Sequence, residues 1–229
     1  MSTHHTFPAD NCPPLAGVLR VGAWSAFASV ALIIVQIVVF AVWPPVHTVP
    51  EVFDLMARSP VLGLVSLDLL YVVNNVLVWL MYLGLGAGLW RVSPSGVLLT
   101  LGLGTLQMAA YFASNPAVEM LSLARAHSGA EPASSAALEA AGEALLANWK
   151  GTAFLTYYFL GAVVLLILFQ VLRRSPDFVP STARWALASG ILMLVPSTFG
   201  TTGLIFSLVS LVPWSVFCLI AGRQLLRLA

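Results

Sequence analysis

Residues 66–86 read "SLDLLYVVNNVLVWLMYLGLG". The stretch is apolar over roughly 20 residues, the length that an α-helix needs to cross the hydrocarbon core of a bilayer. It also contains Asp68 and the pair Asn74 and Asn75, whose side chains lipid cannot solvate. The stretch therefore predicts a membrane-spanning helix whose polar side chains face other parts of the protein.

The composition is that of a membrane protein. Of its 229 residues, 59% are hydrophobic and only 8% are charged, with a mean hydropathy of +0.94, whereas soluble domains are about a quarter charged. The net charge is +1 and no run of four basic residues occurs. This pattern argues against a nucleic-acid partner and against a polybasic patch for anionic lipids.

Apolar stretches recur along the chain between charged residues, prolines and turns. They predict an all-α membrane bundle of six spans, near residues 17–43, 60–90, 95–114, 150–172, 183–199 and 203–223. We expect residues 1–16 to be a disordered cytoplasmic tail and residues 17–229 to form one membrane domain. A re-entrant hairpin is the alternative for the last two spans, because Pro196 and Pro213 interrupt them.

The basic residues predict the orientation of the bundle. Basic residues concentrate on the cytoplasmic side of membrane proteins. A cytoplasmic N-terminus puts seven of them inside and three outside, which favours cytoplasmic placement of both termini. The inner set is Arg20, Arg91, Arg173, Arg174, Arg184, Arg223 and Arg227, and the outer set is Arg58, Arg125 and Lys150.

The longest loop, residues 115–149, predicts two short helices on the outer side. Asn115 is a candidate N-cap with Pro116 at the first helical position, and Ser134 or Ser135 is a candidate cap of the second helix. The second helix is amphipathic, so we expect it to lie at the outer interface as a lid over the bundle. Its apolar face carries Leu138, Leu145 and Trp149.

Five of the predicted spans place a polar side chain at about the same depth. These residues are Gln36, Asn74 or Asn75, Gln107, Tyr157 and Ser210. One hypothesis is that they line an outward-facing cavity, and the alternative is that they form hydrogen bonds between helices. Asp68 and Lys150 stand at the outer rim of the second and fourth spans. The cavity hypothesis assigns ligand binding to Asp68, Tyr71, Asn75, Gln107, Lys150 and Tyr157.

Short motifs indicate helix packing rather than catalysis. Gly84 and Gly88 have the small-xxx-small spacing that lets a neighbouring helix approach closely. The sequence contains no HExxH, CxxC or GxSxG motif and no phosphate-binding loop. We interpret His47 and His127 as solvated loop residues, and we predict neither a metal site nor a cofactor.

Three segments resemble the bacterial multi-pass membrane family catalogued as domain of unknown function 4386. They are "AYFASNPAVEMLSLARAH", "AGEALLANWKGTAFLTYYFLGAVVLLILF" and "LRRSPDFVPSTARWALASGILML", and the likeness covers roughly residues 60–229. Members often carry a polar residue where Leu155 stands. The resemblance implies a protein of the bacterial cytoplasmic (inner) membrane and transfers no catalytic residue. Its densest elements contain Asn115, Pro116, Glu119, Gly151 and Thr152.

Three functions fit these patterns. The first is a protein that binds or transports a small amphipathic molecule through the outward-facing cavity. The second is a non-catalytic membrane partner or sensor, whose outer lid contacts another protein and whose polar residues join helices. The third is a lipid-modifying enzyme, which needs an acid–base pair such as Asp68 with Lys150 or Tyr71. Membrane lipids surround the protein in all three.

Overall fold

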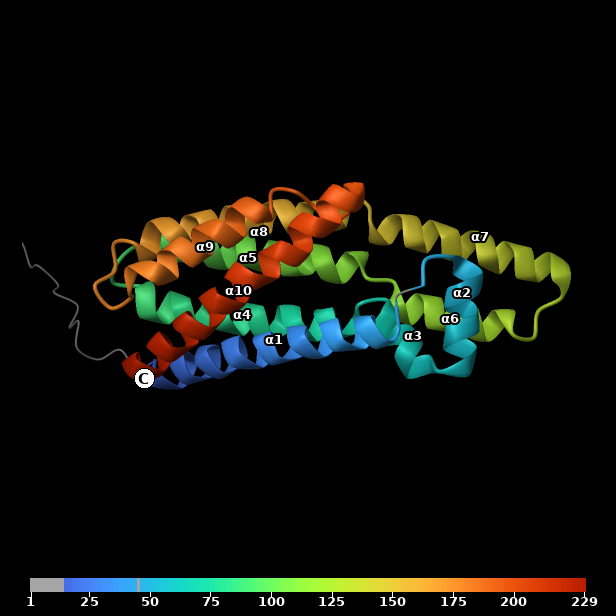
Figure 1. Cartoon of the computed structure of the whole chain (residues 1–229), viewed down its shortest axis with the longest axis horizontal. Helices are drawn as coiled ribbons and strands as arrows, with labels where there is room; N and C mark the ends of the chain where they lie inside the picture. Colours follow the sequence, from blue (N-terminus) through green and yellow to red (C-terminus); the bar gives the residue numbers. More distant parts are fainter. Residues whose placement is uncertain (1–14, 45) are drawn as a thin grey trace, which may run out of the picture.

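The computed structural model describes residues 15–44 and 46–229, and within these residues it is built from helices without a strand. This confirms the all-α prediction. The helices form two groups, the bundle and the outer cap (Figure 1). The bundle comprises α1 (Ala16–Val42), α4 (Leu69–Leu89), α5 (Pro94–Ser114), α8 (Thr152–Leu172), α9 (Pro180–Leu192) and α10 (Gly200–Leu228). The outer cap comprises α2 (Val49–Arg58), α3 (Pro60–Ser66), α6 (Ala117–His127) and α7 (Pro132–Trp149).

The bundle is a closed ring of helices. Following the ring, α1 packs on α4, α4 on α5, α5 on α8, α8 on α9, α9 on α10, and α10 returns to α1. Figure 1 shows α10 running obliquely across α4 rather than parallel to it. The main core lies inside the ring and includes Leu85, Leu165, Phe217 and Leu225, each with no exposed surface.

Among the described residues, five helical segments are long and apolar enough to cross a membrane, which supports a multi-pass membrane protein. They are Ala16–Val42, Leu69–Leu89, Pro94–His127, Pro132–Leu172 and Gly200–Leu228. The fifth predicted span differs from the structure, because α9 has only 13 residues and ends at Leu192. A non-helical link, residues 193–199, follows it. Pro196 in this link has no N–H to donate to the Leu192 carbonyl, so the helix cannot continue through it.

The predicted span over residues 60–90 is also interrupted. Asp68 adopts a left-handed conformation with φ 59°, which separates α3 from α4. The Asn115 amide nitrogen donates to the Leu67 carbonyl at 2.7 Å, and the Asn115 side-chain oxygen accepts from the Ala117 N–H at 3.1 Å. One asparagine therefore supports two breaks, and α6 begins at Ala117, one residue later than predicted.

The outer cap has a small core of its own. Val52, Phe53, Met56 and Met120 are fully or almost fully buried in it. Helix α2 was not predicted, although its start carries a capping box between Thr48 and Glu51. Hydrogen bonds from Thr48 lower the pKa of the Glu51 carboxyl, which is fully exposed.

Helix α7 does not lie across the bundle as the predicted lid. It begins at Pro132 after Glu131 rather than at Ser134 or Ser135, and Figure 1 shows α6 and α7 extending beyond the end of the bundle. The segment Pro94–His127 contains 34 residues, about 50 Å at the helical rise, against a hydrocarbon core of about 30 Å. Helix α7 lies with the outer cap, and not over the bundle, because its residues Leu145 and Trp149 pack on the core of the cap.

Helices α1 and α4 touch backbone to backbone where two glycines meet. A Cβ on Gly84 would lie 2.8 Å from the Gly22 Cα, and a Cβ on Gly22 would lie 2.7 Å from the Gly84 Cα. Gly88 has ordinary room, since its nearest neighbours would be 3.5 Å away. Of the predicted pair Gly84 and Gly88, Gly84 is therefore the position that has no room for a side chain.

We expect Gly84→Ala to destabilise the bundle by about 1–3 kcal/mol, because α1 must move to admit the methyl group. The control is Gly102→Ala, where the new Cβ meets nothing within 4 Å. That change should leave stability unchanged or raise it by up to about 1 kcal/mol, since alanine favours helices. Unfolding in mixed dodecyl maltoside and dodecyl sulfate micelles, followed by circular dichroism, measures both variants. Equal effects would contradict the backbone contact.

Candidate functional site

A polar cavity lies inside the ring between α4, α5, α8, α9 and α10. The space between its lining side chains is about 560 Å³, including the part that is open to the outside, and the centre of a water-sized molecule can reach about 50 Å³ of it. A single buried water needs roughly 10–15 Å³ by the second measure, so the cavity has room for a small polar group. The lining is Tyr71, Asn74, Val78, Tyr82, Gln107, Tyr157, Tyr158, Ser189, Met193, Ser207, Ser210, Leu211 and Trp214.

Helical spacing explains why α4 and α10 supply most of this lining. On α4 the cavity residues recur every three or four positions, which places them on one face. Ser207, Ser210 and Trp214 follow the same rule on α10. The neighbouring residues Val73 and Val209 point away from the cavity and are about half exposed, at 52% and 50%. In a membrane, those two side chains would face lipid.

Three of the predicted ligand-binding residues line the cavity, namely Tyr71, Gln107 and Tyr157. Gln107 is 3% exposed, and its side-chain oxygen has no hydrogen-bond partner among the described residues. Gly161 makes room for it, because a Cβ there would lie 2.7 Å from the Gln107 amide nitrogen. Gln107 is thus a buried polar group held beside open space.

The other three predicted residues lie outside the cavity. Asn75 turns back on its own helix and donates to the Tyr71 carbonyl at 2.9 Å, while its neighbour Asn74 faces the cavity. Asp68 stands at the break before α4. Lys150 is exposed and lies over the Trp149 ring at 5.7 Å. No ion pair joins Asp68 to Lys150.

Some polar side chains do join helices, as the alternative hypothesis proposes. Ser29 on α1 donates to the Asn74 side-chain oxygen at 2.7 Å, and Thr182 on α9 donates to Gln224 on α10 at 2.7 Å. Such bonds are worth about 0.6 kcal/mol on average within membranes. Gln36, the polar residue of the first span, does not line the cavity, and its side-chain oxygen is buried without a partner among the described residues.

An aromatic cluster adjoins the cavity. Its ring centroids lie 5.0–6.3 Å apart, within the range of attractive aromatic pairs. The Tyr158 hydroxyl also contacts the Ser207 hydroxyl at 3.1 Å, which ties α8 to α10. Three members of the cluster, Tyr71, Tyr157 and Tyr158, line the cavity, so this wall combines ring faces with hydroxyl groups. Its members are Tyr71, Tyr111, Phe154, Tyr157 and Tyr158.

Several lining residues were missed by sequence reasoning. Trp214 and Ser207 lie seven residues apart on α10 and flank Ser210, which the depth argument had found. Extending that argument along the helical face of Ser210 would have identified both. Ser189 and Met193 had no such signal, because their position depends on where α9 ends.

The residues singled out by the family resemblance gather where the bundle meets the outer cap. Asn115 and Pro116 lie between α5 and α6, and Gly151 lies between α7 and α8. Glu119 and Thr152 are exposed. Leu155, the departure from the family pattern, is 37% exposed and does not line the cavity. Of these residues, Asn115 holds the junction through its hydrogen bond to the Leu67 carbonyl.

His127 is half-buried rather than solvated. Its Nε2 lies 3.1 Å from a Glu139 carboxylate oxygen and 2.7 Å from the Ser135 hydroxyl. Both partners approach the same nitrogen, which differs from a hydrolase triad, where the base uses one nitrogen for each partner. Within the described part of the chain, no three His, Cys, Asp or Glu side chains are grouped so that they could hold a metal ion.

Comparison with known proteins returned no match, whether to a family model, to a curated protein or to a solved structure. The site is therefore interpreted from its own geometry. The resemblance to the membrane family described above stays a prediction.

We expect Asn115→Leu to destabilise the protein by about 1–3 kcal/mol, because the Leu67 carbonyl is left buried without a donor. Asn148→Leu is the control, since Asn148 is exposed. Unfolding midpoints of the two variants in detergent micelles give the comparison. If Asn115→Leu and the control unfold at the same midpoint, the asparagine does not support the break between α3 and α4.

Proposed function

We propose that this protein binds, and moves across the membrane or presents within it, a small amphipathic molecule that occupies the polar cavity of the bundle. The observation that carries the proposal is Gln107, a residue of the cavity lining whose buried side-chain oxygen lacks a partner among the described residues. Leaving such a group unpaired costs about 1–3 kcal/mol. A ligand that donates a hydrogen bond to it recovers that free energy.

The mixed lining also supports ligand binding rather than simple packing. Binding pockets combine many apolar and aromatic groups with a few converging polar ones. Here Met193, Leu211 and Trp214 supply apolar surface, while Asn74 and Gln107 supply amides. The Asn74 oxygen and the Tyr158 hydroxyl already have partners on other helices, whereas the Gln107 oxygen has none among the described residues.

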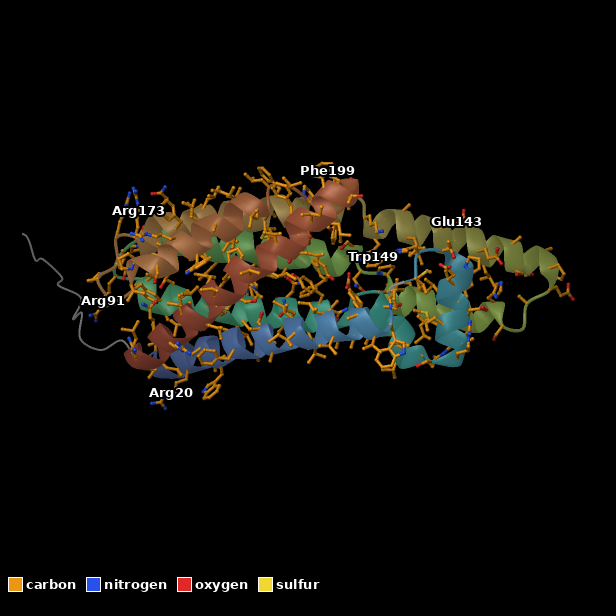
Figure 2. The ribbon with its side chains drawn as sticks, viewed as in Figure 1. Arg20, Arg91, Glu143, Trp149, Arg173 and Phe199 are labelled. Atoms are coloured by element: carbon orange, nitrogen blue, oxygen red, sulfur yellow. The ribbon has the colours of Figure 1, made fainter. Side chains whose placement is uncertain are left out.

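We further propose that the protein crosses the bacterial cytoplasmic membrane six times, with α9 and the following link making the fifth crossing. Figure 2 shows Arg20, Arg91 and Arg173 at the same end of the bundle, the end that carries the C-terminus in Figure 1. Basic residues favour the cytoplasmic side, so this end is assigned to the cytoplasm. The outer cap then faces the outside, and the bacterial assignment rests on the family resemblance.

The interrupted fifth crossing supports the same function. Membrane transporters often form their binding sites where a helix is broken near the middle of the bilayer. In this chain the cavity residue Met193 is the first residue after α9. Non-helical backbone at such a depth is tolerated where protein covers it or where it borders a cavity, and Pro196 in the link is buried.

The second candidate function is contact with a protein partner through the outer cap. It is favoured by the projection of α6 and α7 beyond the bundle (Figure 1) and by apolar side chains on the cap surface. Val61 is 74% exposed and Val118 is 60% exposed. In this case the cavity residues contribute to the stability of the bundle and bind nothing.

Thiol labelling distinguishes these functions. In a Cys12→Ser, Cys218→Ala background, Ser210→Cys and Gln107→Cys place thiols in the cavity. Val209→Cys and Leu106→Cys are the matched controls, because each neighbours a cavity residue yet is at least half exposed on the outer surface of the bundle. A membrane-impermeant thiol reagent added outside intact cells should label the cavity thiols about tenfold faster, because only a hydrated thiol ionises readily.

Silence at both cavity positions, with a thiol on the exposed outer cap labelled as a positive control, would contradict binding from the outside. The search would then move to protein partners of the cap. Labelling that is equal at cavity and control positions would mean that the bundle does not hold the described packing.

A further inference from the structure

The cavity presents hydrogen-bonding groups without charge. Its polar side chains are tyrosines, serines and two amides, none of which ionises near neutral pH. Asp68 and Lys150, the nearest candidates for charged ligands of this site, are not part of the lining. A ligand group in this space therefore meets no counter-charge.

The polar groups of the wall offer both acceptors and donors. The Ser210 hydroxyl already donates to the Ser207 carbonyl at 2.6 Å, and the Ser189 hydroxyl donates to the Trp185 carbonyl at 2.9 Å. A hydroxyl that has used its proton keeps lone pairs that can accept. The Gln107 oxygen is a further acceptor, while the tyrosine hydroxyls, the Asn74 amide nitrogen and the Trp214 N–H can donate. This mixture favours a ligand with hydroxyl groups, which both donate and accept hydrogen bonds.

The charge of the ligand also matters, because an ammonium group carries hydrogen-bond donors too. A cation near an aromatic face gains about 0.5–2 kcal/mol. Placing a charged side chain at the middle of a membrane helix costs at least about 2.5–3.5 kcal/mol on insertion scales. With no carboxylate in the lining, the cost exceeds the gain. A neutral group is therefore favoured over a cation, and an anion meets no basic side chain in the lining to offset the same cost.

We infer that the ligand carries an uncharged, hydroxyl-bearing headgroup of the glycerol or sugar type, attached to an apolar chain. This inference rests on the proposed function and specifies its ligand class. The hydroxyls donate to Gln107, Ser189 and Ser210, and the carbon skeleton of the headgroup packs on the faces of Tyr157 and Trp214. The apolar chain lies against Met193 and Leu211.

The test compares ligands that share one 18-carbon chain and differ in the headgroup. The full chain is placed in phosphatidylcholine nanodiscs, and equilibrium binding of radiolabelled 1-monooleoylglycerol is measured. The competitors are methyl oleate, which has no donor, oleate, which is anionic, and oleylamine, which is cationic. We expect saturable binding of the monoglyceride and competition at least about tenfold weaker by each of the other three, the equivalent of one lost hydrogen bond.

Two glutamines provide a matched pair of variants. Gln107→Leu removes the unpaired oxygen in the cavity, and Gln36→Leu removes a buried unpaired oxygen outside it. Binding of the monoglyceride should weaken about tenfold in Gln107→Leu and stay unchanged in Gln36→Leu. Ser210→Ala is a smaller change at the same site and should weaken binding several-fold, which keeps the test decisive if Gln107→Leu does not fold.

Three results would overturn the ligand class. Competition by oleylamine or oleate that equals the monoglyceride would show that the headgroup need not be neutral, and methyl oleate as an equal competitor would show that donors are not required. Failure of the monoglyceride to bind saturably, while the cavity cysteines still label from outside, would also reject this headgroup and leave the proposed function standing. Loss of that labelling instead counts against the function itself.

Discussion

A backbone carbonyl released inside an apolar environment needs a new donor, and this constraint governs where the chain leaves its helices. Between α3 and α4 the donor is the Asn115 amide, which reaches the Leu67 carbonyl at 2.7 Å. The left-handed backbone at Asp68 costs about 1–2 kcal/mol. One well-made hydrogen bond to a carbonyl that would otherwise be unpaired is of the same size, so the break is held by this contact.

The two interruptions of the ring explain where the cavity lies. Tyr71 is three residues beyond the break at Asp68, and Met193 is the first residue after α9, so each interruption is followed by a cavity residue. At the second interruption the Pro196 carbonyl sits against Gly203 of α10, where a side chain would collide with it.

Hydropathy predicts most of the long helices closely, because lipid demands an unbroken apolar stretch. The predicted span over residues 95–114 corresponds to α5, Pro94–Ser114, and the span over 17–43 corresponds to α1, Ala16–Val42. The break at Asp68 escaped prediction because its support, Asn115, is 48 residues away in the sequence. Local patterns cannot report a donor that arrives from another helix. The start of α2, by contrast, carried a local signal in Thr48 and Glu51 that the sequence reasoning did not use.

For the cavity, the sequence predicts the depth of a side chain in the membrane but not the direction in which it points. Counting residues at 1.5 Å each predicts how deep a side chain lies, and it led to Gln107, Tyr157 and Ser210, which line the cavity. It cannot decide between Asn74 and Asn75, which point about 100° apart on the same helix. Gln36 and Gln107 show the same limit. Both bury an oxygen without a partner among the described residues, yet only Gln107 lines the cavity. An unpaired buried group is evidence for a ligand only when there is space beside it to receive one, and that space depends on how the helices pack.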